Sequence, residues 1–317
     1  MSVVIRLRQP GPSSVLTAED ETVGAPGPGE VRLRHEAIGV NFLDTMFRSG
    51  AVEVPLPFVT GIEGAGVIEA IHPDTRGYSV GDRVAYFFAP GAYAAMRRVA
   101  AEALVPLPAD VGSTTAAAIL TKGITAWLAL RTLFPITGGE TILVQGASGG
   151  VGSLVALWAK SLGATVIGTG TPEKAPDVAA RVDAFIPSSL PDAALQIRHA
   201  APQGVDAVFD FIGKAARDAT MKSVKDGGTI LNIGAASGGS DFDPDLLHQR
   251  RIQILRASAA QAVKGEMLQH AAHDVFAAYR SGTFGEIRPH IYPLSDAPKA
   301  HQDIADRTNS RFAILLP

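Results

Sequence analysis

A strand, a glycine-rich turn and a helix follow one another at residues 141–162, and this order constrains the fold more than any other feature. Thr141–Gln145 is a near-continuous apolar run, as expected of a buried parallel strand. The turn that follows reads Gly-Ala-Ser-Gly-Gly-Val-Gly and leads into a helical pattern at Val151–Leu162. Ala147 occupies the first glycine position of the G-x-G-x-x-G dinucleotide fingerprint. The segment therefore predicts a dinucleotide-binding turn.

Each glycine of this turn has an expected role. Gly149 lets the backbone approach a pyrophosphate, and Gly152 lets the helix pack closely on the strand. The amides around Ser148, Gly150 and Val151 lie where the helix begins, so they are expected to donate to phosphate. The alternative is a flexible glycine loop, but the order of strand, turn and helix favours nucleotide binding.

Strands and helices continue to alternate after the turn. Strands are predicted at residues 165–168, 184–186, 205–211 and 228–233, with helices at 174–181, 190–200 and 215–224. This alternation predicts an α/β fold with a doubly wound parallel sheet, in which right-handed crossovers place helices on the sheet faces.

The first 110 residues have a different pattern, with short apolar runs separated by Gly- and Pro-rich turns. A helix is predicted at Ser113–Leu133, and a second β-containing segment follows a long helical pattern at about Ala262–Ser281. We therefore predict a β-rich domain formed by residues 1–118 and 262–317, with the nucleotide-binding domain at 119–261.

Composition excludes several classes of function. The 317-residue chain has no cysteine, which rules out thiol catalysis, disulfides and cysteine-ligated zinc. Its net charge of −3 gives no reason to expect nucleic acid as a partner. The N-terminus lacks the apolar stretch of a signal peptide, and no uncharged apolar run approaches 18 residues. We expect a cytoplasmic protein that does not insert into membranes.

The second predicted strand bears on the choice of cofactor. NAD-selective sites usually carry an acid about 20 residues after the first glycine, where it binds the ribose 2′-hydroxyl. Here the strand tip carries Gly170, Thr171 and then Lys174, donors that suit a 2′-phosphate. This favours NADPH over NADH, although Glu173 weakens the argument and Lys174 alternatively belongs to an ordinary loop.

Short motifs along almost the whole chain resemble one family. They include Gly39-Val-Asn41-Phe-Leu-Asp44, Gly61-Ile-Glu63-Gly-Ala-Gly66, Lys122-Gly-Ile-Thr125, Asp210-Phe-Ile-Gly213 and Tyr292-Pro-Leu. The chain resembles the zinc-independent medium-chain dehydrogenases/reductases of the quinone oxidoreductase (zeta-crystallin-like) group. The resemblance implies a GroES-like β-rich domain and a Rossmann domain with the cofactor in the cleft. It also implies NADPH-dependent reduction of quinones or activated alkenes, often by a homodimer.

The expectation of a metal-free enzyme rests on the ligands. Zinc-dependent relatives of the group carry a cysteine near position 41 and a histidine after Gly61. Those places read Asn41 and Ile62, and Ile62 cannot bind a metal. We therefore predict no metal site.

The resemblance also implies catalytic positions. Asn41 is expected to orient the substrate or cofactor, and Thr125 to lie near the nicotinamide. Read without the family, a role in capping a helix or turn is the preferred interpretation of both residues, and the resemblance reverses that preference. Many relatives have a tyrosine where this chain has Met46, which cannot donate a proton. Met46, Tyr86 and Tyr93 are predicted to line the substrate pocket, although packing in the core is the alternative for the two tyrosines.

Further cofactor contacts are expected at the strand ends and at two basic positions. Ser188 replaces a tyrosine that relatives place near the 2′-phosphate. The set is completed by Ile212, Gly213, Gly234, Ala235, Arg256 and Arg311.

The predicted function is NADPH-dependent, metal-free reduction of quinones or α,β-unsaturated carbonyls. Two alternatives remain open: a non-catalytic, crystallin-like NADPH-binding protein, and an enoyl-thioester reductase. Loss of the phenol at Met46 favours quinones or simple enones over thioesters, because a reduced quinone can take its proton from water.

Overall fold

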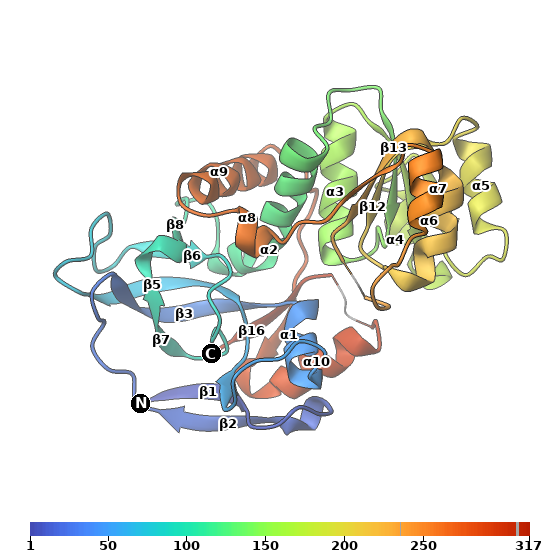
Figure 1. Ribbon diagram of the computed structural model, residues 1–317. Coiled ribbons are helices and arrows are strands. Elements are labelled where there is room, and N and C mark those ends of the chain that lie inside the picture. Colours follow the sequence, from blue (N-terminus) through green and yellow to red (C-terminus); the bar gives the residue numbers. More distant parts are fainter. Residues whose placement is uncertain (235, 309–310) are drawn as a thin grey trace. The chain divides into compact units, whose positions relative to one another are not determined.

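The chain forms two compact units in the computed structural model, which describes residues 1–234, 236–308 and 311–317 (Figure 1). Unit 1 comprises Met1–Thr121, Lys264–Phe276 and Glu286–Pro317, and unit 2 comprises Lys122–Val263 and Ala277–Gly285. From the sequence, all of residues 262–317 were predicted to belong to the first, β-rich domain. Residues 277–285 join unit 2 instead, where the Phe284 ring packs edge-on against Trp158, with 5.4 Å between ring centroids.

Unit 2 contains a six-stranded sheet in the order β11-β10-β9-β12-β13-β14, and every neighbouring pair is parallel. The strands are β9 (Thr141–Gln145), β10 (Thr165–Gly170), β11 (Ala184–Pro187), β12 (Val205–Asp210), β13 (Val224–Asn232) and β14 (Gln253–Leu255). The chain order reverses between β9 and β12, the point at which ligands bind in open α/β sheets. The predicted doubly wound Rossmann fold is confirmed.

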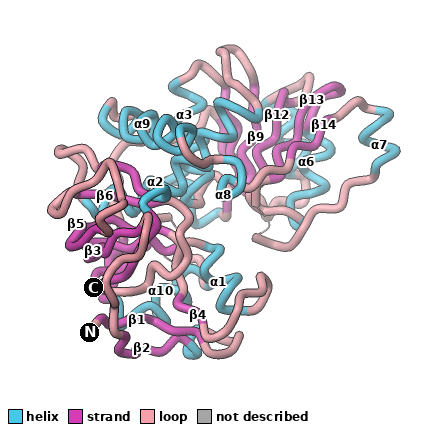
Figure 2. The backbone as a smooth tube through the Cα atoms, turned by 60° about the vertical axis from the view of Figure 1, so that its left-hand side comes forward, coloured by secondary structure: helices cyan, strands magenta, loops and turns pink. Residues whose placement is uncertain are grey.

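Helices cover both faces of this sheet (Figure 1). Helix α3 (Gly150–Ser161) lies on one face, whereas α5 (Ala193–Ala200) and α6 (Arg217–Ser223) lie on the other, with α4 (Ala175–Ala179) and α7 (Pro244–Gln249) completing the set. Ile197 of α5 belongs to a buried core that also contains one residue from each of four strands: Leu143, Ile167, Val208 and Ile230. Figure 2 shows β9, β12, β13 and β14 side by side.

The helix predicted at 174–181 is shorter than expected. A 3-10 turn occupies Pro172–Lys174, and α4 covers only five residues. Pro176 at the start of α4 lacks the N–H that would continue an earlier helical ladder.

Unit 1 is built on a strand path of order β15-β16-β3-β5-β6-β8, with β7 also paired to β3. The strands are β3 (Glu30–Val40), β5 (Glu63–Ile71), β6 (Arg83–Tyr86), β7 (Met96–Ala100), β8 (Leu104–Pro106), β15 (His290–Pro293) and β16 (Ala313–Leu316). A separate sheet, β2-β1-β4, contains β1 (Ser2–Leu7), β2 (Leu16–Glu21) and β4 (Phe58–Val59). Strands from both ends of the chain thus pair in one sheet, since β16 is antiparallel to β3. The expected GroES-like, β-rich architecture is confirmed.

Two predicted helices are divided in the structure. Helix α2 (Ser113–Trp127) passes into a π-helical stretch at Leu128–Leu133, so the predicted 113–133 helix changes its hydrogen-bond pattern midway. The pattern near Ala262–Ser281 becomes α8 (Ala259–Ala262) and α9 (Glu266–Arg280), because Gly265 adopts a positive φ of 55° that no helix tolerates. The remaining helices are α1 (Phe42–Ser49) and α10 (Ala297–Ala305).

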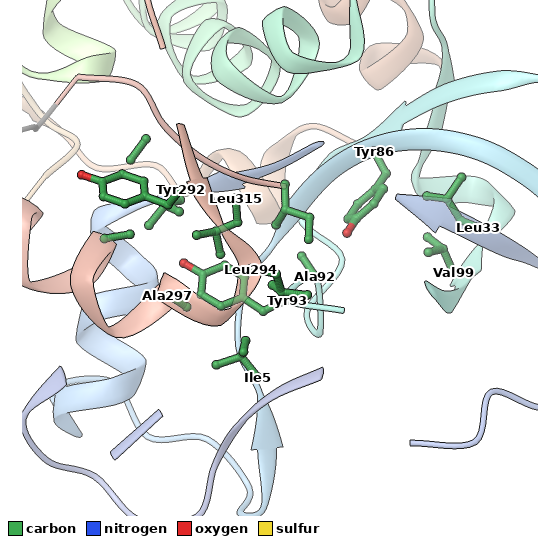
Figure 3. Close-up of a cluster of buried hydrophobic side chains, with 14 of the residues drawn as sticks. Ile5, Leu33, Tyr86, Ala92, Tyr93, Val99, Tyr292, Leu294, Ala297 and Leu315 are labelled. Carbon is green, nitrogen blue, oxygen red and sulfur yellow. The ribbon is translucent and has the colours of Figure 1, made fainter. Parts of the chain in front are cut away.

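The core of unit 1 contains aromatic residues from several strands. Figure 3 shows Tyr86, Tyr93 and Tyr292 among the apolar side chains of this cluster. Tyr86 and Tyr93 are both fully buried. In the part of the chain that the structure describes, no helix has the length and apolar character needed to cross a membrane.

Candidate active site

The predicted cofactor residues of unit 2 lie at one edge of its sheet. Residues 148–152 follow β9, Gly170 ends β10, and Ser188 follows β11. The residues after β12, β13 and β14 complete the row with Ile212, Gly213, Gly234 and Arg256. Because all six strands are parallel, their carboxyl ends meet at this edge, where ligands bind in open α/β sheets. Ala235, which was predicted to contact the cofactor, lies outside the described residues.

The glycine-rich turn starts helix α3 as the sequence predicts. Gly149 is the N-cap, with φ −76° and ψ 170°, and its N–H donates to the Gly146 carbonyl at 3.0 Å. The first N–H groups of an α-helix have no intrahelical acceptor, so those of Gly150 and Val151 are available to an anion. No acid lies in the first turn of this 12-residue helix to compete for them.

Two glycines of the turn differ in how much space surrounds them. A Cβ on Gly152 would lie 2.3 Å from the Gly146 carbonyl oxygen, so any side chain there collides with the backbone of the turn. A Cβ on Gly149 would meet the same oxygen at 3.4 Å, which is ordinary contact. Gly152 is therefore required by the fold, whereas Gly149 leaves room that the protein itself does not fill.

The tip of β10 carries both favourable and unfavourable features for a 2′-phosphate. The Thr169 hydroxyl points inward and donates to Gln145 Oε1 at 2.5 Å, so Thr169 serves the turn and not a ligand. Gly170, Thr171 and Lys174 follow at the tip. The exposed Glu173 has a pKa lowered by its own backbone N–H, by the Thr171 hydroxyl and by Lys174. This carboxylate therefore competes for the donors expected to bind phosphate.

Asp210 shapes the turn after β12, a role that the sequence alone did not reveal. Its Oδ1 accepts hydrogen bonds from the N–H groups of Ile212 and Gly213, both at 2.9 Å. Its Oδ2 is buried and has no hydrogen-bond partner among the described residues, and burial raises the pKa of this carboxyl. The Asp210 side chain thus holds the main chain of Ile212 and Gly213, both of which were predicted to contact the cofactor.

The remaining predicted contacts have local partners. The Ser188 N–H donates to the Gly170 carbonyl at 2.8 Å, so the two strand tips are joined, and its side chain is exposed. Arg256 donates from Nη2 to the Ser240 carbonyl at 3.3 Å. Arg311 belongs to unit 1, where its guanidinium lies 5.2 Å from the centre of the Phe312 ring.

In unit 1, Asn41 is almost fully buried and is held by two carboxylates. It is the N-cap of α1, and its N–H donates to Asp44 Oδ2 at 2.8 Å. Its side-chain Nδ2 donates to Glu63 Oε1 at 2.7 Å. Glu63 Oε2 accepts from the Thr121 N–H at 3.1 Å, which ties the group to α2. Glu63 and Asp44 are 1% and 0% exposed, so two buried carboxylates surround this residue.

Tyr93 belongs to the same polar group and not to an open pocket. Its hydroxyl lies 3.1 Å from Asp44 Oδ2 and 2.9 Å from His301 Nε2. A carboxylate only accepts, so Tyr93 donates to Asp44 and accepts from the Nε2–H of His301. Burial raises the pKa of Tyr93 well above its usual range, and Asp44 adds to this.

Tyr86 is engaged in a second buried pair. His35 Nδ1 lies 2.6 Å from the Ala94 carbonyl, so Nδ1 carries the hydrogen and Nε2 accepts from the Tyr86 hydroxyl at 2.9 Å. Burial raises the pKa of Tyr86 to about 12. Neither Tyr86 nor Tyr93 has exposed surface to offer a substrate, so we do not retain either as a pocket residue.

Two other predicted site residues are half-buried. Met46 lies on α1, one turn after Phe42, a residue that is 45% exposed. Together they give this helix an apolar, partly exposed face close in sequence to Asn41. Thr125 lies in α2, in the part of that helix assigned to unit 2.

The chain matches two family models, each over one segment, and several known proteins over almost its whole length. Residues 27–109 match the alcohol dehydrogenase GroES-like domain, and residues 150–273 match the zinc-binding dehydrogenase domain. The chain is 36% identical to a quinone oxidoreductase of Pseudomonas aeruginosa, with 97% of each chain covered. It is 33% identical to a 2-haloacrylate reductase of a Burkholderia species, with 100% of this chain and 99% of the relative covered.

Solved structures agree with these matches. A Pseudomonas syringae quinone oxidoreductase has a TM-score of 0.96 at 35% identity, and 100% of each chain is covered. The Escherichia coli quinone oxidoreductase complexed with NADPH has a TM-score of 0.95 at 30% identity, covering 99% of this chain and 100% of that one.

The residues present do not fit the zinc ion that one family model mentions in its description. The sequence contains no cysteine, and the residue after Gly61 is the buried Ile62. In the described ranges, no three His, Asp or Glu side chains come together as a metal site. Catalytic zinc sites use three protein ligands, and residues 1–234, 236–308 and 311–317 do not bring such a set together.

Proposed function

Because the chain belongs to the quinone oxidoreductase family of medium-chain dehydrogenases/reductases, we propose that it reduces quinones or activated alkenes with NADPH and without a metal. The chain is an oxidoreductase of that family. The observation that carries the proposal is the glycine-rich turn at the start of α3, whose free space at Gly149 suits the approach of a pyrophosphate.

The residues at the carboxyl edge of the unit 2 sheet fit NADPH. The amides of Gly150 and Val151 would bind the pyrophosphate, aided by the dipole of α3. Gly170, Thr171 and Lys174 would bind the adenosine 2′-phosphate, with Ser188 beside Gly170. The turn held by Asp210 would place the backbone of Ile212 and Gly213 against the cofactor.

When bound, reduced nicotinamide supplies the hydride, and the protein residues orient the acceptor. We propose that Asn41 orients the carbonyl of a quinone or enone, on which negative charge develops as the hydride arrives. Met46 has no proton to give, so the resulting oxyanion takes its proton from water to complete the two-electron reduction. The apolar face formed by Phe42 and Met46 favours flat, apolar acceptors.

The proposed reaction is tested by NADPH oxidation with a panel of quinones, enones, 2-haloacrylates and enoyl thioesters. Turnover with quinones or simple enones is the expected result. Saturable quenching of NADPH fluorescence with no turnover on any acceptor would favour the non-catalytic alternative. Turnover with thioesters alone would replace the proposed substrate class.

Removal of metals is expected to leave the activity intact. Dialysis against a chelator should change kcat by less than about twofold, because the chain has no cysteine and its described part does not bring together the three ligands that catalytic zinc needs. The measurement is kcat before and after dialysis, with metal content determined by mass spectrometry. Activity that is lost on dialysis and returns with Zn²⁺ would contradict the metal-free proposal.

Lys174→Ala is expected to weaken selection of NADPH over NADH. A hydrogen bond to a charged group contributes about 1.5–3 kcal/mol, so KM for NADPH should rise roughly 10-fold or more. KM for NADH should stay within about twofold, since NADH has no 2′-phosphate for the lysine to bind.

Lys222→Ala is the matched control for this variant. Lys222 is 63% exposed on α6 and pairs with Asp218, one helical turn away. Equal losses for NADPH and NADH in Lys174→Ala would remove Lys174 from the proposed phosphate site.

A further inference from the structure

Asn41 is held in one orientation by Glu63, a carboxylate that the proposed reaction does not use directly. Glu63 Oε1 accepts from Asn41 Nδ2 at 2.7 Å. A carboxylate has no hydrogen to donate, so only the NH2 end of the Asn41 amide can face it. Glu63 therefore turns the NH2 end of the planar amide toward itself, beside the capping box at the start of α1, which also engages the Asn41 side chain.

The second oxygen of Glu63 is held by a donor of its own, which fixes the position of the carboxylate. Oε2 accepts from the main-chain N–H of Thr121 at 3.1 Å. That N–H belongs to α2, so its direction is set by the helix and cannot turn to suit another group. Glu63 thus joins a fixed donor on α2 to a rotatable amide at the start of α1.

The fold leaves space for this carboxylate by means of a glycine. Gly39 in β3 lies directly across from Glu63 in β5, in the antiparallel register of the two strands. A Cβ on Gly39 would lie 2.5 Å from Glu63 Cδ and Oε1, and 2.4 Å from the Ala117 carbonyl. The φ of Gly39 is not positive, so what the position requires is space and not backbone freedom.

A carboxylate at this place does what a neutral side chain of the same size cannot do. Glu63 is 1% exposed, and removing a carboxylate from water is costly even when it is hydrogen-bonded. A neutral glutamine would fill the same volume without that cost. What a glutamine cannot do is accept from both Asn41 and Thr121 through two separate oxygens, because one of its two terminal atoms is an NH2 group.

We infer that Glu63 is a positioning residue for the reaction, which it serves by fixing the orientation of the Asn41 amide. The inference rests on the proposed role of Asn41 and goes beyond it, because Glu63 acts through Asn41 and not on the substrate or cofactor. Asp44 complements it by holding the main-chain N–H of Asn41 at 2.8 Å.

Glu63→Gln reverses the polarity of the contact without changing its size. The introduced glutamine must turn its oxygen to the Thr121 N–H, so its NH2 faces Asn41, which then has to present its oxygen instead. We expect kcat to fall by up to roughly 100-fold, because loss of an oriented donor itself costs about 100- to 1,000-fold and Glu63 acts only through Asn41. KM for NADPH should stay within about twofold, because the main-chain amides of unit 2 that are proposed to bind the cofactor are unchanged.

Glu36→Gln is the matched control. Glu36 is a half-buried glutamate of β3, and its Oε2 accepts from the Ser113 hydroxyl at 2.6 Å. It takes no part in holding Asn41, so kcat should stay within about twofold of the wild type. A similar fall in kcat in both variants would show that neutralising any glutamate of this unit impairs the enzyme, and would overturn the inference.

A double variant keeps the test decisive if Glu63→Gln alone is unstable. In Glu63→Gln/Asn41→Asp, the NH2 of the introduced glutamine donates to the new carboxylate, so a hydrogen bond is restored with reversed polarity. Thermal stability should recover while kcat remains low. Because Asn41 itself is replaced, thermal stability is the deciding measurement, and no recovery of stability in the double variant would overturn the inference.

A second readout does not depend on turnover. The side-chain NH2 signals of Asn41 can be assigned in ¹⁵N NMR spectra by their loss in Asn41→Asp. They should shift and exchange faster with solvent in Glu63→Gln, and they should be unchanged in Glu36→Gln. Unchanged signals in Glu63→Gln would refute the positioning role even if no quinone is reduced, whereas failure of the acceptor panel alone would refute only the proposed function.

Discussion

Gly149→Val is expected to give a folded protein that binds NADPH at least roughly 100-fold more weakly, or about 2.7 kcal/mol. The backbone of Gly149 is in an extended conformation that valine adopts readily, and its Cβ would meet the protein only at 3.4 Å. The added methyl groups would occupy the space through which the backbone approaches the pyrophosphate. Fluorescence titration with NADPH measures the affinity, and thermal unfolding separately measures the stability.

Gly152→Val and Gly24→Val are the controls for this experiment. Valine at 152 would place its Cβ 2.3 Å from the Gly146 carbonyl, so it should lower the free energy of unfolding by at least about 1–3 kcal/mol. Valine at 24 has no atom within 4 Å of its Cβ and should change neither quantity. Retained NADPH affinity in folded Gly149→Val would remove the turn from the cofactor site.

Acidification is expected to destabilise unit 1 through two buried histidines, His35 and His301. Burial lowers the pKa of His35 to about 3, and burial together with Arg48 lowers the pKa of His301 to about 3. In the unfolded chain a histidine binds its proton near pH 6.5. Between pH 6.5 and 3 the unfolded state therefore holds up to two more protons, and stability falls as the pH falls.

The expected loss of unfolding free energy as the pH falls is large compared with the stability of a typical domain. Two protons correspond to about 2.7 kcal/mol for each pH unit, and so to about 5 kcal/mol between pH 6.5 and 4.5. Since folded proteins have about 5–15 kcal/mol in total, this loss should remove a large share of the free energy of unfolding of unit 1 by pH 4.5. The measurement is the free energy of unfolding in urea, followed by circular dichroism from pH 7.5 to 4.5.

His35→Gln and His301→Gln should each flatten this dependence by up to one proton. Glutamine can donate to the Ala94 carbonyl and accept from Tyr86 as His35 does, yet it does not titrate. His248→Gln, at an exposed position on α7, serves as the control. Three identical slopes, all equal to that of the wild type, would mean that other groups cause the acid sensitivity.

The nucleotide-binding sheet was largely predictable because its signals are local. The predicted strand at Thr141–Gln145 coincides with β9, and the fingerprint places α3 within one residue of its observed limits. A buried parallel strand needs a continuous apolar run, and a tight turn into a helix needs glycine, so both features can be read in a short window.

Edge strands and short helices were not predictable in the same way. Strand β2 reads Leu-Thr-Ala-Glu-Asp-Glu, which has little intrinsic preference for a sheet. It forms by pairing with β1, where Arg6 donates to Glu19 at 2.9 Å across the two strands. Such a strand depends on its neighbour and not on its own sequence.

The sequence by itself determined the fold class, the position of the dinucleotide turn and the absence of thiolate ligands, since each depends on residue type over short spans. Only the tertiary structure decided what surrounds Asn41. Glu63 lies 22 residues from Asn41, and His301 lies 208 residues from Tyr93. The register of β3 against β5 and the pairing of β16 with β3 belong to the fold as a whole. Burial by those strands turned two predicted pocket tyrosines into core residues and made Glu63 the side chain that orients Asn41.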